Sequence, residues 1–267
     1  MELMTVTAIG LLLFVALIFS PLGLGGGILY VPILHYILEW EMQAAVIGSL
    51  TLIFMVSLGS SLAHSKSGYA DNKVANIGRS TAIPFAIIGT ILSGILLDKV
   101  GDVGIKILAT IVIIYVIERT ISKMRLEANQ IDKEIPISEK KRQYQIGNAF
   151  AGMSTGILGI GGGAILVTLN RSILKMDAHK AAGTSYLIAA TIVPVALLSH
   201  ILLDGITGDL YDKVGLLSII IVPVLAFSCA FFGAKFAIKH ISKNIVTIVF
   251  LCSISASLIR YIMDFIQ

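Results

Sequence analysis

The chain has 267 residues, of which 56% are apolar and only 13% are charged; its net charge is +4 and its mean hydropathy is +0.92. Soluble domains carry about a quarter of their residues as charged side chains, so this composition excludes a soluble globular domain, a disordered chain, a coiled coil and a nucleic-acid-binding protein. It indicates an integral membrane protein, whose positive charges have to be assigned loop by loop before they suggest any partner.

Taken in chain order, the apolar segments are of two kinds. Two regions, 5–38 and 145–174, are apolar throughout but interrupted by glycines. A charged linker, 122–144, separates the halves of the chain. The remaining runs are each long enough to cross a bilayer as a helix of about 20 residues; they lie near 44–63, 78–97, 105–121, 181–203, 214–237 and 245–263.

Each interrupted region contains a glycine cluster. The first has the sequence Ser-Pro-Leu-Gly-Leu-Gly-Gly-Gly at 20–27, and the second Gly-Ile-Leu-Gly-Ile-Gly-Gly-Gly at 156–163. After each cluster only about 11 residues remain before a polar turn, which at 1.5 Å per residue is half a membrane. Each region is therefore predicted to be a pair of short helices, or a re-entrant hairpin, broken at depth, with the second helices beginning at Gly27-Ile28 and Gly163-Ala164.

The two halves of the chain repeat each other. Gly25-Gly26-Gly27 recurs as Gly161-Gly162-Gly163, and Ala45–Ser49 is echoed at almost the same separation by Lys180–Thr184. Further matches in the same order, at separations that drift only slightly, pair His64 with His200, Lys73 with Lys213, Pro84 with Pro223 and Gly94 with Gly233. We call the separation of Gly25 and Gly161 the repeat offset. The sequence thus predicts one repeat at 1–121 and a second at 145–267, each a broken hairpin followed by three transmembrane helices.

The distribution of Lys and Arg decides the relative orientation of the repeats. If each glycine region enters and returns, 16 of the 20 basic residues lie on the linker side, leaving Lys99, Lys106, Lys213 and Arg260 on the other. If each crosses once, the division is 12 to 8. The positive-inside rule favours the first arrangement. We therefore expect an all-α polytopic plasma-membrane protein of two inverted repeats, with a cytoplasmic linker and both termini outside.

The glycine clusters are the candidate substrate site. Three glycines at membrane depth are costly unless the exposed backbone lines a cavity or packs against protein. In inverted-repeat transporters, half-helix N-termini, each with about half a positive charge, bind anions at such breaks. The candidate groups are the backbone N–H groups and nearby hydroxyls of Gly25, Gly26, Gly27, Gly161, Gly162, Gly163, Ser20, Ser49, Ser154, Thr155, Thr184 and Ser185.

The glycine clusters have two other interpretations. Glycines also allow close helix packing without binding anything. A nucleotide-binding loop is disfavoured, because neither cluster ends in Gly-Lys-Ser/Thr or follows a strand.

Two further sets of residues are candidates for a role. His64 and His200, near the ends of matched runs, are interpreted either as a proton relay, as imidazolium contacts for an anion, or as interfacial helix-end histidines. The aromatic residues near predicted interfaces are interpreted as membrane-belt side chains: Tyr30, Tyr36, Trp40 and Tyr261.

The motif Gly-Leu-Gly-Gly-Gly-Ile-Leu-Tyr-Val-Pro at 23–32, its partial duplication at 159–168 and Ala-Ala-Gly-Thr-Ser at 181–185 resemble the TauE/SafE sulfite exporter family, also called the toluene-sulfonate uptake permease family. The resemblance covers essentially the whole chain. It implies transport of a small sulfur-containing anion such as sulfite, sulfoacetate or another organosulfonate. Thr168 stands where the first copy has Pro32, so the two short helices are not expected to be strictly alike.

We therefore expect a secondary transporter of a small sulfur-containing oxyanion that works by alternating access. An anion channel, or a proton-coupled permease for carboxylates or other organic anions, is the alternative on the same scaffold. A membrane enzyme would need paired carboxylates or a metal set at depth, whereas Glu118 and Asp264 are isolated near span ends.

Other partners are limited. The only cysteines, Cys229 and Cys252, lie in apolar runs, so neither a metal nor another cofactor is expected. The expected partners are the small anion and the lipid bilayer, with no nucleic acid, and the oligomeric state is left open.

Overall fold

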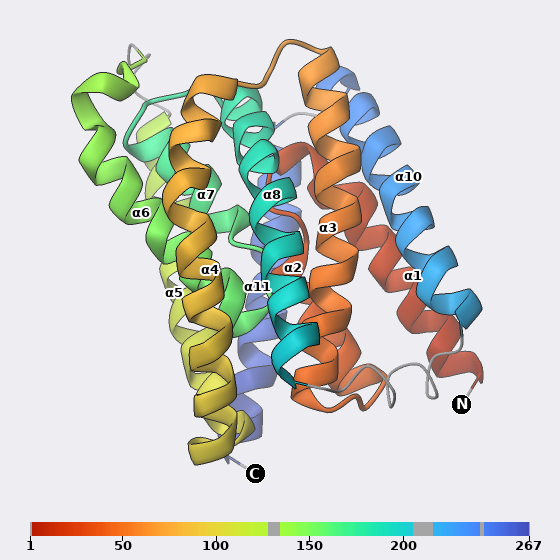
Figure 1. The fold of residues 1–267 in the computed structure, drawn as a ribbon. Helices are drawn as coiled ribbons and strands as arrows, with labels where there is room; N and C mark the ends of the chain where they lie inside the picture. Colours follow the sequence, from red (N-terminus) through yellow and green to blue (C-terminus); the bar gives the residue numbers. More distant parts are fainter. Residues whose placement is uncertain (1, 128–133, 205–215, 241–242, 267) are drawn as a thin grey trace.

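The computed structural model of the chain describes residues 2–127, 134–204, 216–240 and 243–266. These residues form helices joined by short turns, with no strand among them, which confirms the predicted all-α polytopic membrane fold (Figure 1). Within this part of the chain, five helices are long and apolar enough to cross a membrane: Met4–Leu22, Met42–Lys66, Asn72–Val100, Ala178–Leu203 and Ile219–His240.

The first half of the chain begins with a long helix and a short one. Its elements are α1 (Glu2–Phe19), the 3₁₀ turn η1 (Ser20–Leu22), α2 (Gly27–Pro32), the π-helical turn η2 (Ile33–Ile37), α3 (Met42–Lys66), α4 (Asn72–Val100) and α5 (Asp102–Glu127). With 18 residues, α1 is about 27 Å long. Only the second arm of the broken hairpin, α2, is therefore short. The sequence predicted either a pair of short helices or a re-entrant hairpin, and the length of α1 does not fit a pair of short helices.

The second half has the same order of long and short helices. Its elements are α6 (Ile137–Leu158), α7 (Gly163–Ser172), α8 (Ala178–Asp204), α10 (Leu216–His240) and α11 (Lys243–Ile266). Helices α5 and α6 both extend into the predicted linker at 122–144. Lys213 and the predicted start of the 214–237 run lie outside the described residues.

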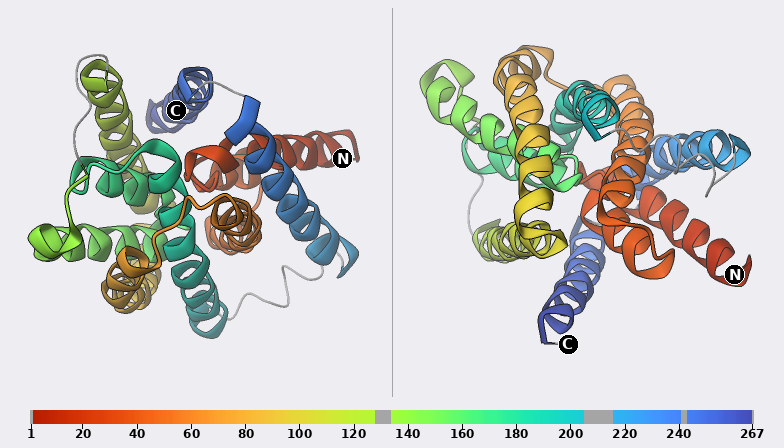
Figure 2. Two further views of the ribbon diagram at one scale, coloured as in Figure 1. Left: turned by 90° about the horizontal axis from the view of Figure 1, so that it is seen from above. Right: turned by 60° about the horizontal axis from the view of Figure 1, so that its bottom comes forward.

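The two broken hairpins enter the bundle from opposite ends. Both termini lie at one end, the terminal side, while the α3–α4 and α7–α8 loops lie at the other, the linker side (Figure 1). Helix α1 enters from the terminal side, α6 enters from the linker side, and α2 and α7 lead back to the side of entry. Figure 2 shows α3 and α8 together between α4 and α10, with α5 and α11 on a shared flank. Two inverted repeats require these placements.

Glycines let the outer helices approach the hairpins closely. A Cβ atom placed on Gly89 of α4 would collide with the Met153 carbonyl oxygen of α6, and one on Gly233 of α10 with the Leu17 carbonyl oxygen of α1. Because Leu17 and Met153 are separated by the repeat offset, Gly89 is the counterpart of Gly233. The predicted pairing of Gly94 with Gly233 is wrong, since a Cβ on Gly94 would meet nothing within 4 Å.

The outward face of α4 is apolar. Ile87, Ile88, Ile91 and Ile95 are between 41% and 48% exposed. Such a contiguous apolar face is a liability in water but is the expected surface toward lipid. The exposed isoleucines therefore agree with the composition in placing this helix at the periphery of a membrane-embedded bundle.

Candidate functional site

The two glycine loops, residues 23–26 and 159–162, lie against each other in the interior of the bundle. A Cβ atom placed on Gly27 would collide with the Ile160 carbonyl oxygen, and one on Gly163 would lie 2.8 Å from the Leu24 carbonyl oxygen. These contacts are related by the repeat offset. The short helices α2 and α7 begin at Gly27 and Gly163, where the sequence predicted them. We call this meeting point the glycine crossing.

The backbone of both loops takes a conformation that favours glycine. Gly25 and Gly26 have φ of 70° and 78°, and Gly161 and Gly162 have φ of 73° and 62°. Side chains with a Cβ atom rarely adopt this left-handed region. The six glycines predicted from the sequence are thus brought together, and four of them have positive φ angles that favour glycine.

Two of the predicted hydroxyls hold the loops in place. Ser49 of α3 donates from Oγ to the Gly159 carbonyl oxygen at 2.7 Å, and Ser185 of α8 donates to the Gly23 carbonyl oxygen at 2.8 Å. Each serine therefore bonds to the loop of the other repeat, and the two serines are again separated by the repeat offset. Their protons stabilise the crossing rather than facing an open site.

The other predicted hydroxyls have different surroundings. Ser20 donates to the Leu17 carbonyl oxygen at 3.0 Å and Thr155 to the Ala151 carbonyl oxygen at 2.7 Å, within their own helical segments. Thr184 accepts from the Asp71 backbone N–H at 3.1 Å and so faces the linker-side loop. The buried Ser154 hydroxyl has no hydrogen-bond partner among the described residues.

Two buried tyrosines contact the first glycine loop. Tyr186 of α8 accepts from the Gly25 N–H at 3.2 Å and donates to the Phe19 carbonyl oxygen at 3.1 Å. Tyr30 of α2 lies over Gly26, because a Cβ atom placed there would be 3.0 Å from Oη. The belt interpretation of Tyr30 is wrong, since its exposure is 0%. Tyr186 was not singled out; its sole sequence signal is a phenol directly after the Gly-Thr-Ser segment.

The two histidines are buried, but they do not form a pair. His64 Nδ1 lies 2.9 Å from the Ser60 carbonyl oxygen, and His200 Nε2 lies 2.7 Å from the Gly156 carbonyl oxygen. Helices α3 and α8 run in opposite directions, so the two residues lie toward opposite ends of the bundle (Figure 1). Neither is an exposed interfacial side chain, because their exposures are 0% and 1%.

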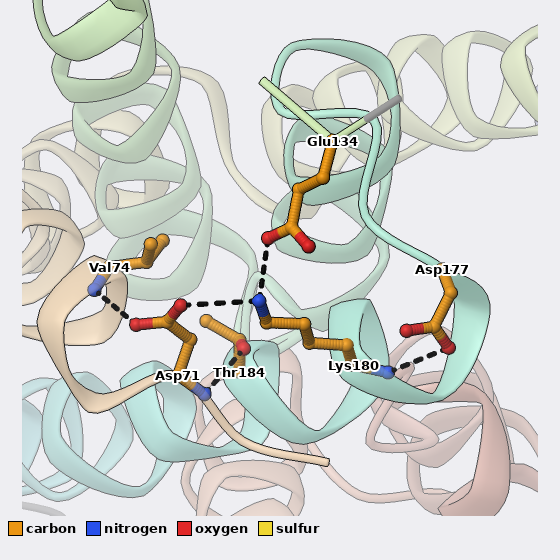
Figure 3. Close-up of polar contacts among 6 residues, drawn as sticks. All are labelled: Asp71, Val74, Glu134, Asp177, Lys180 and Thr184. Atoms are coloured by element: carbon orange, nitrogen blue, oxygen red, sulfur yellow. Dashed lines mark hydrogen bonds and ion pairs between the residues drawn. The ribbon is translucent and has the colours of Figure 1, made fainter. Parts of the chain in front are cut away.

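An ion-pair network joins three segments at the linker side (Figure 3). Lys180 Nζ lies 2.6 Å from Glu134 Oε1 and 3.4 Å from Asp71 Oδ2. Asp71 also caps α4 by accepting from the Val74 N–H at 3.0 Å, while Asp177 accepts from the Lys180 N–H at 3.2 Å at the start of α8. The network therefore fixes the α3–α4 loop to the beginning of α8.

A second network lies at the terminal side. Asp264 of α11 pairs with Lys106 of α5, and Tyr36 donates to the same carboxylate at 3.4 Å. The Arg260 guanidinium lies over the Tyr36 ring, 4.5 Å from its centre. The sequence suggested that Asp264 is isolated. In the structure it instead forms an ion pair between helices that are distant in the chain.

Long apolar helices around two opposed, glycine-broken hairpins define the class of the protein, a multi-pass membrane protein. Sequence comparison gives the family. Residues 8–261 match the sulfite exporter TauE/SafE family, and the chain belongs to it. It is also 26% identical over 233 residues to the "Probable membrane transporter protein MJ0441" of Methanocaldococcus jannaschii, covering 84% of this chain and 82% of that protein. No solved structure matches it with significance.

Proposed function

We propose that the protein is a secondary transporter that moves a small sulfur-containing oxyanion, sulfite or an organosulfonate such as sulfoacetate, across the plasma membrane by alternating access. The glycine crossing carries the proposal. Two helix N-termini meet there, and each carries about half a positive charge. The first N–H groups of each helix have no carbonyl acceptor within that helix. Such helix ends attract an anion.

The hairpins carry no formal charge that competes with the backbone. No Asp, Glu, Lys or Arg occurs at residues 3–38 or 143–170. Backbone dipoles therefore dominate the field at the glycine crossing, and they favour a compact anion over a cation. Membership of the sulfite exporter family supports a sulfur oxyanion as the class of substrate.

The glycine crossing is closed in this structure. The carbonyl oxygens of Leu24 and Ile160 lie where a Cβ atom on Gly163 or Gly27 would be, and on this proposal the loops separate before an anion reaches the helix ends. One loop belongs to each repeat, and the hairpins enter from opposite ends. Tilting one repeat against the other would open the crossing to one side at a time. Export of a monoanion from a cell that is negative inside is favoured by about 2.3 kcal/mol per 100 mV.

Exchange transport in proteoliposomes tests this function. Vesicles that hold the full-length protein and unlabelled sulfoacetate should take up labelled sulfoacetate from outside, with a rate that saturates with concentration. A current that rises linearly with concentration and shows no counterflow would indicate an anion channel. Uptake of acetate without uptake of sulfite or sulfoacetate would indicate a carboxylate permease. Either result would overturn the proposal.

A further inference from the structure

Buried polar side chains gather around the first glycine loop. Ser57, Ser60 and His64 follow one another on α3 at spacings of three and four residues, so they share one helix face. Each has an exposure of 0%. The His64 ring lies 5.8 Å from the Tyr186 ring, and the Ser60 hydroxyl lies beside the Tyr186 hydroxyl that holds the Gly25 N–H.

The second glycine loop has no such surroundings. One repeat offset away, the positions of Tyr30, Ser57 and Ser60 are occupied by Leu166, Val193 and Ala196, and that of Tyr186 by Leu50. These four apolar side chains are fully buried as well. The scaffold of the two repeats is symmetric and each repeat has a buried histidine, His64 or His200, but the tyrosines and serines of the cluster belong to the first glycine loop only. Helix packing alone does not explain this difference, because the apolar set packs equally well at the matched positions.

Several polar atoms of this cluster have no partner among the described residues. They are Tyr30 Oη, Ser57 Oγ, Ser60 Oγ and His64 Nε2. Ser60 lies near the Tyr186 hydroxyl and His64 near the Pro21 carbonyl oxygen, but neither contact has the geometry of a hydrogen bond. Buried polar atoms in native proteins are nearly always hydrogen-bonded, so four unsatisfied atoms around one loop indicate that a ligand supplies the missing bonds. By contrast, Ser61, the neighbour of Ser60, donates to the Leu58 carbonyl oxygen at 2.9 Å.

The chemistry of the cluster favours an anion. Three of the four atoms are hydroxyls that can donate, and the hairpins bring no carboxylate to them. His64 Nδ1 faces the Ser60 carbonyl oxygen, which only accepts, so Nδ1 carries a proton. Nε2 can then donate to an oxyanion only when the imidazole gains a second proton. The titratable groups that face the cluster are Tyr186 and His179 from α8, Tyr30 from α2 and Cys229 from α10.

We infer that Tyr30, Ser57, Ser60 and His64 form a single oxyanion-binding site at the first glycine loop, that its ligand is a sulfonate or sulfite group, and that one proton is taken up at His64 Nε2 when the anion binds. The inference rests on the proposed function and deepens it, because it assigns the substrate to one repeat rather than to both. The second loop then serves as the matching structural arm.

Binding measurements on the purified full-length protein test this site. The probe is isethionate, whose sulfonate stays ionised between about pH 5 and 8, the range in which histidine titrates. Ser60→Ala and Tyr30→Phe should each weaken isethionate binding about tenfold or more, as expected for a lost hydrogen bond to a charged group. The matched controls Ser61→Ala and Tyr144→Phe should bind as the wild type does, since these hydroxyls bond to Leu58 and Asn170.

The pH dependence tests the proton at His64. Wild-type affinity should fall with rising pH, approaching tenfold per pH unit once the free imidazole is neutral, because binding then has to take up a proton. His64→Gln keeps a donor that does not titrate, so its affinity should be independent of pH. His200→Gln should retain the wild-type pH dependence, since His200 Nε2 faces the Gly156 carbonyl oxygen.

The outcomes separate the site from the function. Thermal unfolding without ligand controls for folding: Ser60→Ala and Tyr30→Phe remove unsatisfied buried groups, so they should melt no lower than the wild type. If the wild type binds isethionate and Ser60→Ala and Tyr30→Phe bind it equally well, the site is wrong while the proposed function stands. If the wild type binds neither isethionate, sulfite nor sulfoacetate, the proposed function fails, and this inference fails with it.

Discussion

At the scale of single residues, the second glycine loop combines two demands that only glycine meets. Gly162 has φ of 62°, and a Cβ atom on it would lie 2.7 Å from Thr155 Oγ1 and 2.8 Å from the Ala151 carbonyl oxygen. A side chain there is therefore strained by its backbone and crowded by its neighbours. Gly94, in the interior of α4, meets neither demand, because a Cβ atom on it has nothing within 4 Å.

These two glycines form a matched pair for mutation. Gly162→Ala should lower the free energy of unfolding by about 1–2 kcal/mol and slow exchange transport at least tenfold, since the loop must shift to accept the methyl group. Gly94→Ala should instead raise stability by about 0.5–1 kcal/mol and leave transport unchanged. Thermal unfolding in detergent and proteoliposome exchange measure both effects. Wild-type transport by Gly162→Ala would show that the glycine crossing is not the transport site.

Which features of single residues the sequence could predict depends on how far apart in the chain the interacting residues lie. The glycines were found because a break in an apolar run is a local pattern. Ser49 and Ser185 are predicted from the sequence as substrate contacts. In the structure their hydroxyls bond to loop carbonyl oxygens that lie 110 and 162 residues away in the chain, which no local pattern indicates. The same holds for Tyr30, whose burial depends on helices that no local spacing identifies. The spacing of Ser57, Ser60 and His64 indicates a shared helix face, but it does not show that this face lies at the first glycine loop.

At the scale of elements, the two short helices end differently because of one proline. Pro32 ends α2, and the chain continues as the π-helical turn η2, in which the Leu38 N–H donates to the Ile33 carbonyl oxygen at 3.3 Å. In α7 the corresponding residue is Thr168, and the helix continues regularly until the Ile173 N–H bonds to Leu169 at 2.9 Å. This difference was predictable, since a proline lacks an N–H and acts locally. The length of α1 was less predictable, because the glycine cluster marks where the helix is broken but not how deep in the membrane the break lies.

The linker-side network contains an element-scale test, because Asp71 both caps α4 and pairs with Lys180. Asp71→Asn keeps an oxygen for the Val74 N–H and removes only the charge, so it should cost no more than about 0.5 kcal/mol, as expected for a partly exposed ion pair. Asp71→Ala also removes the cap and should cost about 1 kcal/mol in total. Unfolding in detergent at low and high salt separates the two, since salt screens only the ion pair. An equal loss for both variants would mean that the ion pair dominates.

At the scale of the whole molecule, the charge distribution and the fold support the same orientation. The α3–α4 loop begins after Lys66, and Arg171, Lys175 and Lys180 lie in or beside the α7–α8 connection, all at the linker side. Lys99 and Lys106 lie at the opposite end, next to the termini. By the positive-inside rule, we expect an apolar bundle with this asymmetry to insert with its basic side in the cytoplasm. Because the two hairpins enter from opposite ends, this orientation also decides which glycine loop is approached from which compartment.

Cysteine accessibility in intact cells tests the orientation. Cys229 and Cys252 are first replaced by Ser, and a single cysteine is then introduced at Lys66, beside the α3–α4 loop, or at Lys99, near the α4–α5 turn; both positions are exposed. A membrane-impermeant maleimide added outside should label Lys99→Cys and leave Lys66→Cys unlabelled until the cells are opened. The reverse pattern would place the linker outside, against the positive-inside rule. Labelling of both from outside would require the two ends of α4 to lie on one face of the membrane, which a helix of 29 residues that spans the bilayer does not allow.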